Sequence, residues 1–353
     1  MSTDELFEFE NVVSSTCDAP ILAPREKAIY AASRKIASTK VQRNALRVCN
    51  RIVGRFDPVR YLQLGKSPNV LLIGAICGDD LNLLKAISNW RRKFDLVAAF
   101  VCDCWAPEIY PTFTRHLDHL FVPMPEMVEQ LTDAFRIPVT CIPFGANVLE
   151  FGSCQKPEAR PIDLISFGRT PQHHHESFSK ISSGQDPSFR YLRTIARRND
   201  DNPKLDYKQR VDRNDLRQLY KDLSHSKLAL CYESVFPGMR PFPHSFLTMR
   251  WFEAGAAGCV MVGKRPSTPL ADDLLDWENS TIELPSDGEE AVEQIKELLK
   301  YPDRLGEISK RNYEQNLRRH DWRWRIKQML ELLKTPVPTK LNAQLQEIEA
   351  KYS

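Results

Sequence analysis

The residues best placed to do chemistry surround Glu253. Residues 250–263 combine a helix rich in Ala and Gly, which ends at Gly258, with the apolar strand that follows it. A carboxylate on such a helix lies near the carboxyl edge of a parallel sheet, where open α/β folds bind nucleotides. Glu253 is therefore a candidate to hold both hydroxyls of a ribose, as acidic residues do in dinucleotide-binding folds. An ordinary surface glutamate is the alternative, and the small residues and buried strand beside Glu253 favour the functional interpretation.

Groups that suit a diphosphate occur in two other segments. Arg169 follows an apolar strand predicted over residues 162–167, and its guanidinium can pair with a diphosphate through two hydrogen bonds. Residues 242–247 lead into the helix of Glu253, so their backbone N–H groups can contact the same phosphates at a helix N-terminus. Together with Glu253, these segments predict a phosphorylated, ribose-bearing ligand.

Asp103 is the candidate for proton transfer. It follows a strand predicted over residues 94–102 and would face the same sheet edge as the other candidates. A carboxylate there can accept a proton from a substrate hydroxyl or hold a sugar hydroxyl. A turn or helix cap at the end of the strand is an equally good interpretation, and both stay open here.

Three consecutive histidines, residues 173–175, raise the question of a metal site. Successive side chains face one centre only with unusual backbone geometry, and no H-E-x-x-H spacing accompanies them. Two interpretations of the histidines remain open: a polar loop, or a contact with a phosphate or with an acceptor substrate. The chain also has no pair of aspartates separated by one residue, a spacing that often holds a divalent ion. We therefore expect neither a metal nor another cofactor.

The elements that must position these residues alternate between strand and helix. Strands separated by helices are the pattern of parallel, doubly wound sheets, so the sequence predicts an α/β fold. The predicted strands cover residues 68–75, 94–102, 118–123, 137–143, 162–167, 227–232 and 259–263, and the predicted helices cover residues 125–135, 189–198, 214–224 and 288–300.

Weak periodicity, with Gly and Pro, over residues 149–161 predicts a linker. We therefore expect two Rossmann-like domains on either side of it, with a cleft between them. The predicted boundaries are 1–152 for a first, acceptor-side domain and 160–333 for a second, nucleotide-binding domain. Residues 334–353 are expected to form a short amphipathic tail helix.

Positive charge is concentrated near the start of the chain. The formal net charge is only +3, yet residues 25–60 hold ten basic residues against two acidic ones and are expected to be helical. Four arginines recur at every fourth position and would form one stripe on a helix: Arg43, Arg47, Arg51 and Arg55. A solvated helix face is one interpretation, and attraction to anionic lipid head groups or to a phosphorylated acceptor is the other. Nucleic acid is not expected, because no recognition motif accompanies the stripe.

Composition excludes several classes of protein. No apolar run approaches the ~20 residues of a membrane span, and the acidic residues 4–5 are unlike a secretory signal. We expect a cytoplasmic protein, peripheral at the inner membrane surface if the basic stripe binds lipid. The nine cysteines contain no C-x-x-C pair and are expected to be buried, reduced thiols. The motifs of serine hydrolases, P-loop NTPases and dinucleotide-dependent dehydrogenases are missing.

Three segments resemble those of a known family. Residues 248–253, followed by Gly258, resemble the Thr-x-Arg-x-Phe-Glu…Gly signature of the group-one glycosyltransferases of the GT-B fold, in particular the spore-maturation glycosyltransferase-like branch. Residues 301–325 are similar to the C-terminal segment of that branch with its His-x-Trp-x-x-Arg helix. Residues 103–147 look like the first-domain segment that ends in Pro-Phe-Gly-Ala-Asn. The resemblance spans residues 67–333.

The resemblance implies a GT-B glycosyltransferase with a nucleotide-sugar donor in the second domain and a glycan, lipid-linked or small-molecule acceptor in the first. It assigns the ribose to Glu253 and the diphosphate to Arg169. It also implies a metal-independent and retaining transfer, with Asp103 and Glu253 as the candidate catalytic residues. The implied donor-binding set comprises Gly168, Arg169, His174, Ser245, Phe246, Leu247, Arg250 and Glu253.

Two positions depart from the family pattern. Ser245 stands where the wider family often has a glutamate eight residues before Glu253, and histidines stand where it often has a lysine after Arg169. The identity of the donor is therefore open. A catalytically silent GT-B-like protein that binds a sugar or an anion is the main alternative, and a sugar-nucleotide epimerase of the same fold is a further one.

Overall fold

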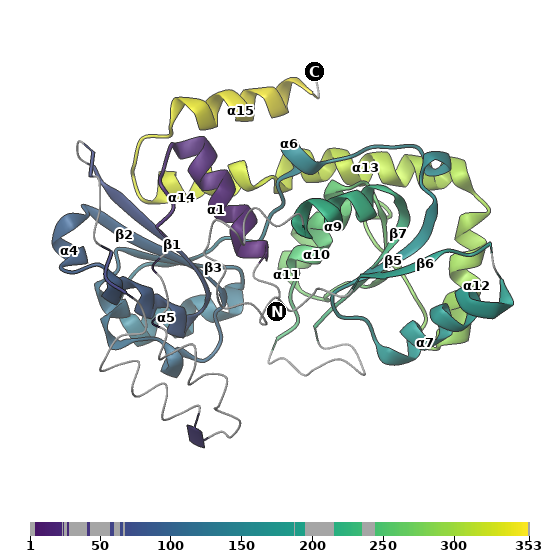
Figure 1. Ribbon diagram of the computed structural model, residues 1–353, viewed down its shortest axis with the longest axis horizontal. Coiled ribbons are helices and arrows are strands. Elements are labelled where there is room, and N and C mark those ends of the chain that lie inside the picture. Colours follow the sequence, from purple (N-terminus) through teal and green to yellow (C-terminus); the bar gives the residue numbers. More distant parts are fainter. Residues whose placement is uncertain are drawn as a thin grey trace.

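The chain folds into two halves that lie side by side along the long axis of the molecule (Figure 1). The structure is a computed structural model, and it describes residues 4–22, 24, 27, 41–42, 57–59, 64–65, 68–186, 188–194, 215–234 and 244–351. The arginine stripe predicted at residues 43–55 lies outside the described residues. Among the described helices, none combines the length and the hydropathy of a membrane-spanning segment.

Helices surround both sheets (Figure 1). Shorter helical turns, of the 3-10 or π type, cover Gly78–Ala86, Pro107–Ile109, Thr112–His116, Pro125–Met127, Pro157–Ala159 and Ile181–Gln185. The α-helices are α1 (Asp4–Cys17), α4 (Trp90–Lys93), α5 (Val128–Phe135), α6 (Val148–Phe151), α7 (Gln172–Lys180), α9 (Asp215–Ser224), α10 (Met249–Ala256), α11 (Pro269–Leu274), α12 (Gly288–Leu299), α13 (Pro302–His320), α14 (Trp322–Leu332) and α15 (Thr339–Ala350).

The first half is built on a parallel sheet with four described strands. They lie in the order of the sequence, β1-β2-β3-β4, so the reversal of a doubly wound sheet is not seen among its described strands. Residues 97–102 of the second strand are all buried, as expected for a strand that is covered on both faces. The strands are β1 (Val70–Cys77), β2 (Leu96–Asp103), β3 (His119–Val122) and β4 (Val139–Cys141).

The second half carries a parallel sheet with five described strands in the order β6-β5-β7-β8-β9. The chain forms β6 on one side of β5 and then returns to the other side to form β7. The carboxyl edge between β5 and β7 is therefore a topological switch point, where open α/β sheets bind ligands. The strands are β5 (Ile162–Phe167), β6 (Tyr191–Thr194), β7 (Ser226–Tyr232), β8 (Val260–Lys264) and β9 (Ile282–Glu283).

Alternate residues of the second sheet enter two different cores. On β7, Leu228, Leu230 and Tyr232 belong to a core shared with α7 and α12, whereas Ala229 and Cys231 belong to the other core. That other core continues into the first half, because it also contains the buried residues of β2 and β3. The two halves are therefore packed together through a common apolar interior.

The expected α/β class with two parallel sheets is confirmed, but two local expectations are wrong. Residues 189–198 were expected to be helical, yet Tyr191 pairs with Leu164 of β5 as part of the edge strand β6. Aromatic and β-branched side chains such as Tyr191 and Thr194 suit a strand. The histidines at 173–175 lie on α7 rather than in a polar loop, because two parallel strands need a crossover connection and α7 supplies it.

The last two helices return to the first half. Trp322 at the start of α14 packs on Phe100 of β2, with ring centroids 6.0 Å apart. Helix α15 packs against α1 and α14 and buries Leu341 and Ile348. The boundaries expected at residues 152, 160 and 333 stay predictions, and α14 contacts the first half although it precedes residue 333.

Helix α1 joins the two halves through Glu8, which is only 1% exposed. Its Oε1 accepts a hydrogen bond from the backbone N–H of Asn147 at 2.6 Å and another from the Tyr220 hydroxyl on α9 at 3.0 Å. Its Oε2 is buried and has no hydrogen-bond partner among the described residues. Burial, with smaller effects of the charges on Asp321 and Glu150, raises the pKa of Glu8 to about 8. A protonated carboxylic acid therefore holds this joint at neutral pH.

Glu8→Gln tests the joint through the pH dependence of stability. The pKa of Glu8 rises from 4.5 to about 8 in the folded state, so the folded protein keeps a proton that the unfolded chain releases. The free energy of unfolding therefore falls as pH rises between these values and levels off above the higher one. Glutamine stays neutral, so we expect the melting temperature of the variant to lack that fall and to exceed the wild-type value at pH 9. Thermal unfolding followed from pH 4.5 to 9 measures it.

Glu347→Gln on α15 is the control, because that carboxylate is exposed and pairs with Lys351 at 3.6 Å. Its melting temperatures should follow those of the wild type across the same pH range. Equal pH slopes for Glu8→Gln and the wild type would show that Glu8 is already ionised in the folded protein.

Candidate functional site

Two of the predicted site residues lie at the carboxyl edge of the second sheet. Gly168 and Arg169 directly follow β5, and Glu233 directly follows β7, the two strands at which the order reverses. Strands β5 and β7 pair directly, with Ile165 opposite Ala229. Neighbouring strands lie ~4.8 Å apart. The switch point therefore has a basic residue on one side and an acidic residue on the other.

Arg250 on α10 fixes the loop that follows β5. Its Nη1 donates to the carbonyl oxygen of Arg169 at 3.1 Å. Its guanidinium lies against Gly168, where an added Cβ would come within 2.7 Å of Nε. Gly168 has a φ of +81°, which L side chains rarely adopt. Glycine is thus required both by the close guanidinium and by the backbone, and it lets the Arg250 side chain reach the backbone of Arg169.

The N-terminus of α10 begins at the same edge without a side-chain cap. Thr248 is the N-cap residue, but its hydroxyl makes no hydrogen bond to the helix, and no acidic residue lies in the first turn. Helix α12 differs, because Asp287 accepts hydrogen bonds from two of its first N–H groups. An uncapped helix N-terminus that carries Arg250 in its first turn favours an anion.

Glu253 lies in the second turn of α10 and is 5% exposed. Its charge helps to raise the pKa of Tyr220 on α9, after the larger effects of burial and of Glu8. It also adds to the raised pKa of Cys231 on β7, where burial is the main cause. The carboxylate therefore lies within electrostatic reach of Tyr220 on α9 and Cys231 on β7.

Ser245 makes a contact that the sequence did not predict. Its Oγ donates to Oε2 of Glu233 at 2.6 Å. Beside this pair, Ser234 Oγ donates to the carbonyl oxygen of His244 at 2.9 Å. Glu233 was missed as a site residue, although it is the first residue after the strand expected over residues 227–232 and could have been found by its position at a strand end.

The carboxyl edges of the two sheets meet at a pair of aromatic rings. Trp105 follows β2 and Phe246 precedes α10, and their ring centroids lie 5.1 Å apart at an angle of 70°. Asp103 is the half-buried last residue of β2. Phe246 and Leu247 are 7% and 5% exposed. The predicted catalytic Asp103 and the predicted donor-binding segment therefore approach one another from different sheets.

His174 lies in the core and not at this edge, because its side chain has no exposed surface. Its Nδ1 is hydrogen-bonded to the Tyr232 hydroxyl, and its ring centroid lies 6.2 Å from that of Phe178. Burial lowers the pKa of His174, so the imidazole is neutral at physiological pH. The donor contact expected of His174 is therefore replaced by a packing role between α7 and β7.

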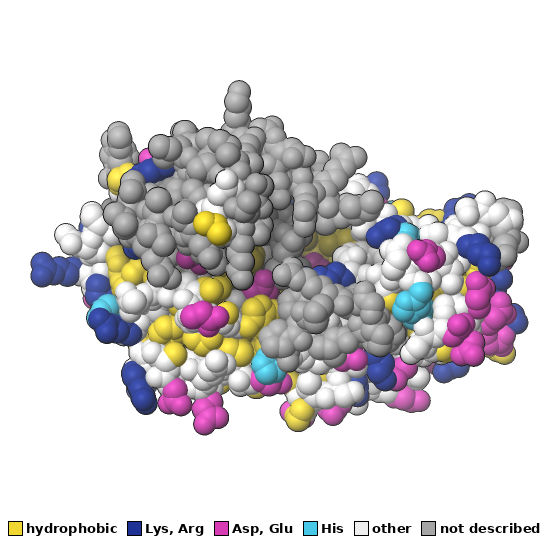
Figure 2. All heavy atoms as spheres, turned by 90° about the horizontal axis from the view of Figure 1, so that it is seen from below, with side chains coloured by type: hydrophobic (Ala, Val, Ile, Leu, Met, Phe, Trp, Pro, Cys, Tyr) yellow, Lys and Arg dark blue, Asp and Glu magenta, His cyan; other side chains and the backbone are white. Residues whose placement is uncertain are grey.

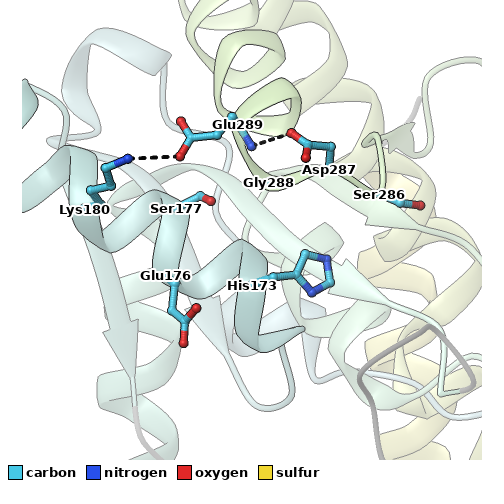
Figure 3. Close-up of a pocket in the computed structure, with 8 residues that line it drawn as sticks. All are labelled: His173, Glu176, Ser177, Lys180, Ser286, Asp287, Gly288 and Glu289. Atoms are coloured by element: carbon cyan, nitrogen blue, oxygen red, sulfur yellow. Dashed lines mark hydrogen bonds and ion pairs between the residues drawn. The ribbon is translucent and has the colours of Figure 1, made fainter.

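A hollow of about 520 Å³ lies between α7 and α12 and is lined by another of the histidines, His173 (Figure 3). Lys180 pairs there with Glu289 at 3.3 Å, and Asp287 accepts from the backbone N–H of Glu289 at 2.9 Å. Glu176 adds a further carboxylate. Acidic side chains also gather on the surface at this end of the molecule (Figure 2). A diphosphate would be repelled by this charge, so the hollow does not suit the predicted donor.

Metal ligands and reactive thiols do not cluster in the described part of the chain. No three His, Cys, Asp or Glu side chains are placed there to hold an ion. The described cysteines are free, and burial raises the pKa of Cys231, Cys104 and Cys259, so these thiols stay protonated and unreactive. The expectation of a metal-independent reaction stays a prediction.

Several known proteins resemble this chain. Residues 179–331 match a family model described as glycosyl transferase-like. No curated protein matches the chain. The structure of OtsA without ligand is similar at 12% identity and a TM-score of 0.48, over 96% of this chain and 86% of that one. HepE of Anabaena in complex with UDP-glucose is similar at 13% identity and a TM-score of 0.45, over 74% of this chain and 78% of that one.

An α1,3-fucosyltransferase is similar at 12% identity and a TM-score of 0.33, over 71% of this chain and 83% of that one. One architecture serves many reactions, so likenesses of this size say nothing of the chemistry. The match to the family model is a sequence match, and it includes Ser245, Arg250 and Glu253. The two parallel sheets fit the GT-B architecture expected from the sequence, and the residues that match the glycosyl transferase-like model, 179–331, form most of the second half.

Proposed function

We propose that the protein is a glycosyltransferase that moves a sugar from a nucleoside diphosphate to an acceptor hydroxyl. The observation that carries this proposal is that the Arg250 guanidinium, the backbone of Arg169 and the uncapped N-terminus of α10 lie together at the switch point of the second sheet. A guanidinium and helix N–H donors at one edge suit a diphosphate. The glycosyl transferase-like match over residues 179–331 supports the same donor.

The proposed donor lies across this edge. Its diphosphate contacts Arg169 and Arg250, and its ribose hydroxyls contact Glu253 in the second turn of α10. Its sugar extends toward the first half, where Asp103 ends β2. The nucleotide is thus held by the second sheet, and the anomeric carbon faces the acceptor.

Transfer breaks the bond between the anomeric carbon and the diphosphate oxygen, and the electron pair leaves with the diphosphate. Arg169 and Arg250 stabilise the charge that develops on this leaving group, a task that metal ions perform elsewhere. An acceptor hydroxyl forms the new bond to the anomeric carbon and gives its proton to Asp103. The proposed reaction is metal-independent, and it is retaining because the acceptor attacks from the face that the diphosphate leaves.

The proposed acceptor is a glycan, a lipid-linked sugar or a small molecule. Attraction to an anionic surface rests on the sequence pattern of the arginines at residues 43–55, which lie outside the described residues. On that ground the proposal includes peripheral contact of a cytoplasmic protein with the inner membrane surface.

A catalytically silent protein that binds a sugar or an anion is the second candidate, and Ser245 favours it. Its hydroxyl is bound to Glu233 at 2.6 Å, at the position where the wider family often has a glutamate. Both candidates bind a ligand at the same edge. Only the transferase consumes a nucleotide sugar when an acceptor is present, so turnover separates the two.

A thermal-shift screen of the purified protein tests the proposal. UDP, GDP, ADP and CMP, and their common sugar esters, are each added with and without a divalent metal. We expect one nucleoside diphosphate and its sugar esters to raise the melting temperature equally with and without metal, because a bound ligand stabilises the folded state by mass action. No stabilisation by any of these ligands would contradict the proposal. Stabilisation without turnover would favour the silent protein.

Glu253→Gln should weaken binding of the nucleotide found in that screen. The amide keeps the size of the side chain but loses its charge and one acceptor oxygen, so we expect a loss of roughly 1–3 kcal/mol in binding free energy. Isothermal titration calorimetry measures the Kd, and the melting temperature without ligand shows that the variant is folded. Unchanged affinity would remove Glu253 from the site.

Gly168→Ala should displace Arg250. The added Cβ meets Nε of Arg250 at 2.7 Å, and a left-handed backbone costs an L residue about 1–2 kcal/mol. We expect a lower melting temperature and about a tenfold loss in affinity for the nucleoside diphosphate, or about 1.4 kcal/mol. Gly184→Ala is the matched control, because nothing lies within 4 Å of its added Cβ. Wild-type nucleotide affinity in Gly168→Ala would count against the role of Arg250.

A further inference from the structure

Glu233 is held in place at both its backbone and its side chain. Its N–H donates to the carbonyl oxygen of Lys264 at 2.8 Å, which fixes the chain as it leaves β7. Its Oε2 accepts from Ser245 Oγ at 2.6 Å. The next residue, Ser234, donates to the carbonyl oxygen of His244 at 2.9 Å. Two adjacent bonds therefore tie the end of β7 to the segment before α10, and the carboxylate lies at this tie.

The contacts of Glu233 leave its carboxylate with capacity for a ligand. A carboxylate offers about four acceptor positions, and the bond from Ser245 takes one of them on Oε2. None of the ion pairs between described residues includes Glu233, whereas Glu283 at the end of β9 pairs with Lys264 at 2.6 Å. A half-buried carboxylate that is held by a hydroxyl, and not by a cation, suits a ligand that donates hydrogen bonds.

The position of Glu233 suits the sugar of the proposed donor better than the diphosphate. Glu233 directly follows β7, and Arg169 follows the neighbouring strand β5 at the switch point. Ser245 directly precedes Phe246, which contacts Trp105 of the first half. The carboxylate therefore lies between the cationic residues and the place where the two halves meet. A phosphate would be repelled by it, and a sugar hydroxyl would donate to it.

We propose that Glu233, oriented by Ser245, binds hydroxyl groups of the donor's sugar. The inference rests on the proposed function and names the residue that recognises the sugar rather than the nucleotide. Ser245 acts through Glu233 and is a positioning residue. Glu233, at the end of β7, thus supplies the carboxylate that the wider family often has at the position of Ser245.

The test compares a nucleoside diphosphate with its hexose ester. Calorimetry gives the Kd of UDP and UDP-glucose, of GDP and GDP-mannose, and of ADP and ADP-glucose for the wild type and for Glu233→Gln. For the pair that binds, we expect the Kd of the hexose ester to rise about tenfold or more in the variant, the scale of a lost hydrogen bond to a charged group. The Kd of the diphosphate alone should stay within about twofold, because Glu233 does not contact it.

The outcomes distinguish failure of the inference about Glu233 from failure of the proposed function. If the wild type binds a pair but Glu233→Gln loses both ligands equally, or loses neither, the inference is overturned and the proposed function stands. If the wild type binds none of the pairs, the proposed function itself is overturned. Glu283→Gln is the matched control, since it removes another carboxylate from the same sheet edge, and it should bind both ligands as the wild type does.

Ser245→Ala and Ser245→Thr separate orientation of the carboxylate from simple closure of the loop. We expect the alanine variant to raise the Kd of the hexose ester about three- to tenfold without changing the Kd of the diphosphate. The threonine variant, which keeps the hydroxyl, should restore the wild-type Kd of the hexose ester. A lower melting temperature with an unchanged ratio of the two Kd values would show that the bond only closes the loop, and would overturn the role of Ser245.

Discussion

The arrangement of both halves depends on the pairing of the loop after β4 with the passage between α13 and α14. The backbone N–H of Ala146 donates to the carbonyl oxygen of His320 at 3.0 Å, and the N–H of Trp322 donates back to the carbonyl oxygen of Ala146 at 3.0 Å. Gly145 is needed beside them, because a Cβ there would meet the carbonyl oxygen of His320 at 2.8 Å. This short ladder carries the chain from the second sheet back to the first and so orients their carboxyl edges.

Buried charges reinforce the ladder, and each has partners. Asp321 has no exposed surface and pairs with Arg323 at 2.9 Å. Arg325 donates to Nδ1 of His320 at 3.0 Å, while Nε2 of that ring bonds to a backbone carbonyl at 2.8 Å. Burial and then the charge of Arg325 lower the pKa of His320 well below its usual value, so the ring is a neutral acceptor for the guanidinium. Buried ion pairs add little stability by themselves, but losing one partner is strongly destabilising, which makes this geometry specific.

The sequence predicts the parts of the fold that depend on neighbouring residues. Apolar runs predict most of the strands, and the end of a run correctly places Arg169 at a carboxyl edge. The helix expected at β6 fails because a short edge strand is defined by its partner β5 more than by its own pattern. Contacts between distant residues leave no local pattern either. The bond between Ser245 and Glu233 spans 12 residues, and the bond between Glu8 and Tyr220 spans 212.

Among the described residues, the two halves meet both at the joint around Glu8 and at the carboxyl edges of the sheets, and these contacts differ in kind. At the joint, the common core is joined by hydrogen bonds from the backbone N–H groups of Asn147 and Leu149 to the buried carboxyl groups of Glu8 and Asp321. At the carboxyl edges, the ring contact of Trp105 with Phe246 contributes only about 0.5–1.5 kcal/mol beyond the free energy of burying its apolar surface. The joint therefore holds the two halves together more firmly than the ring contact does. The weaker contact lies beside Asp103 and the segment before α10, so the region proposed to bind substrates is also the one that is less firmly packed.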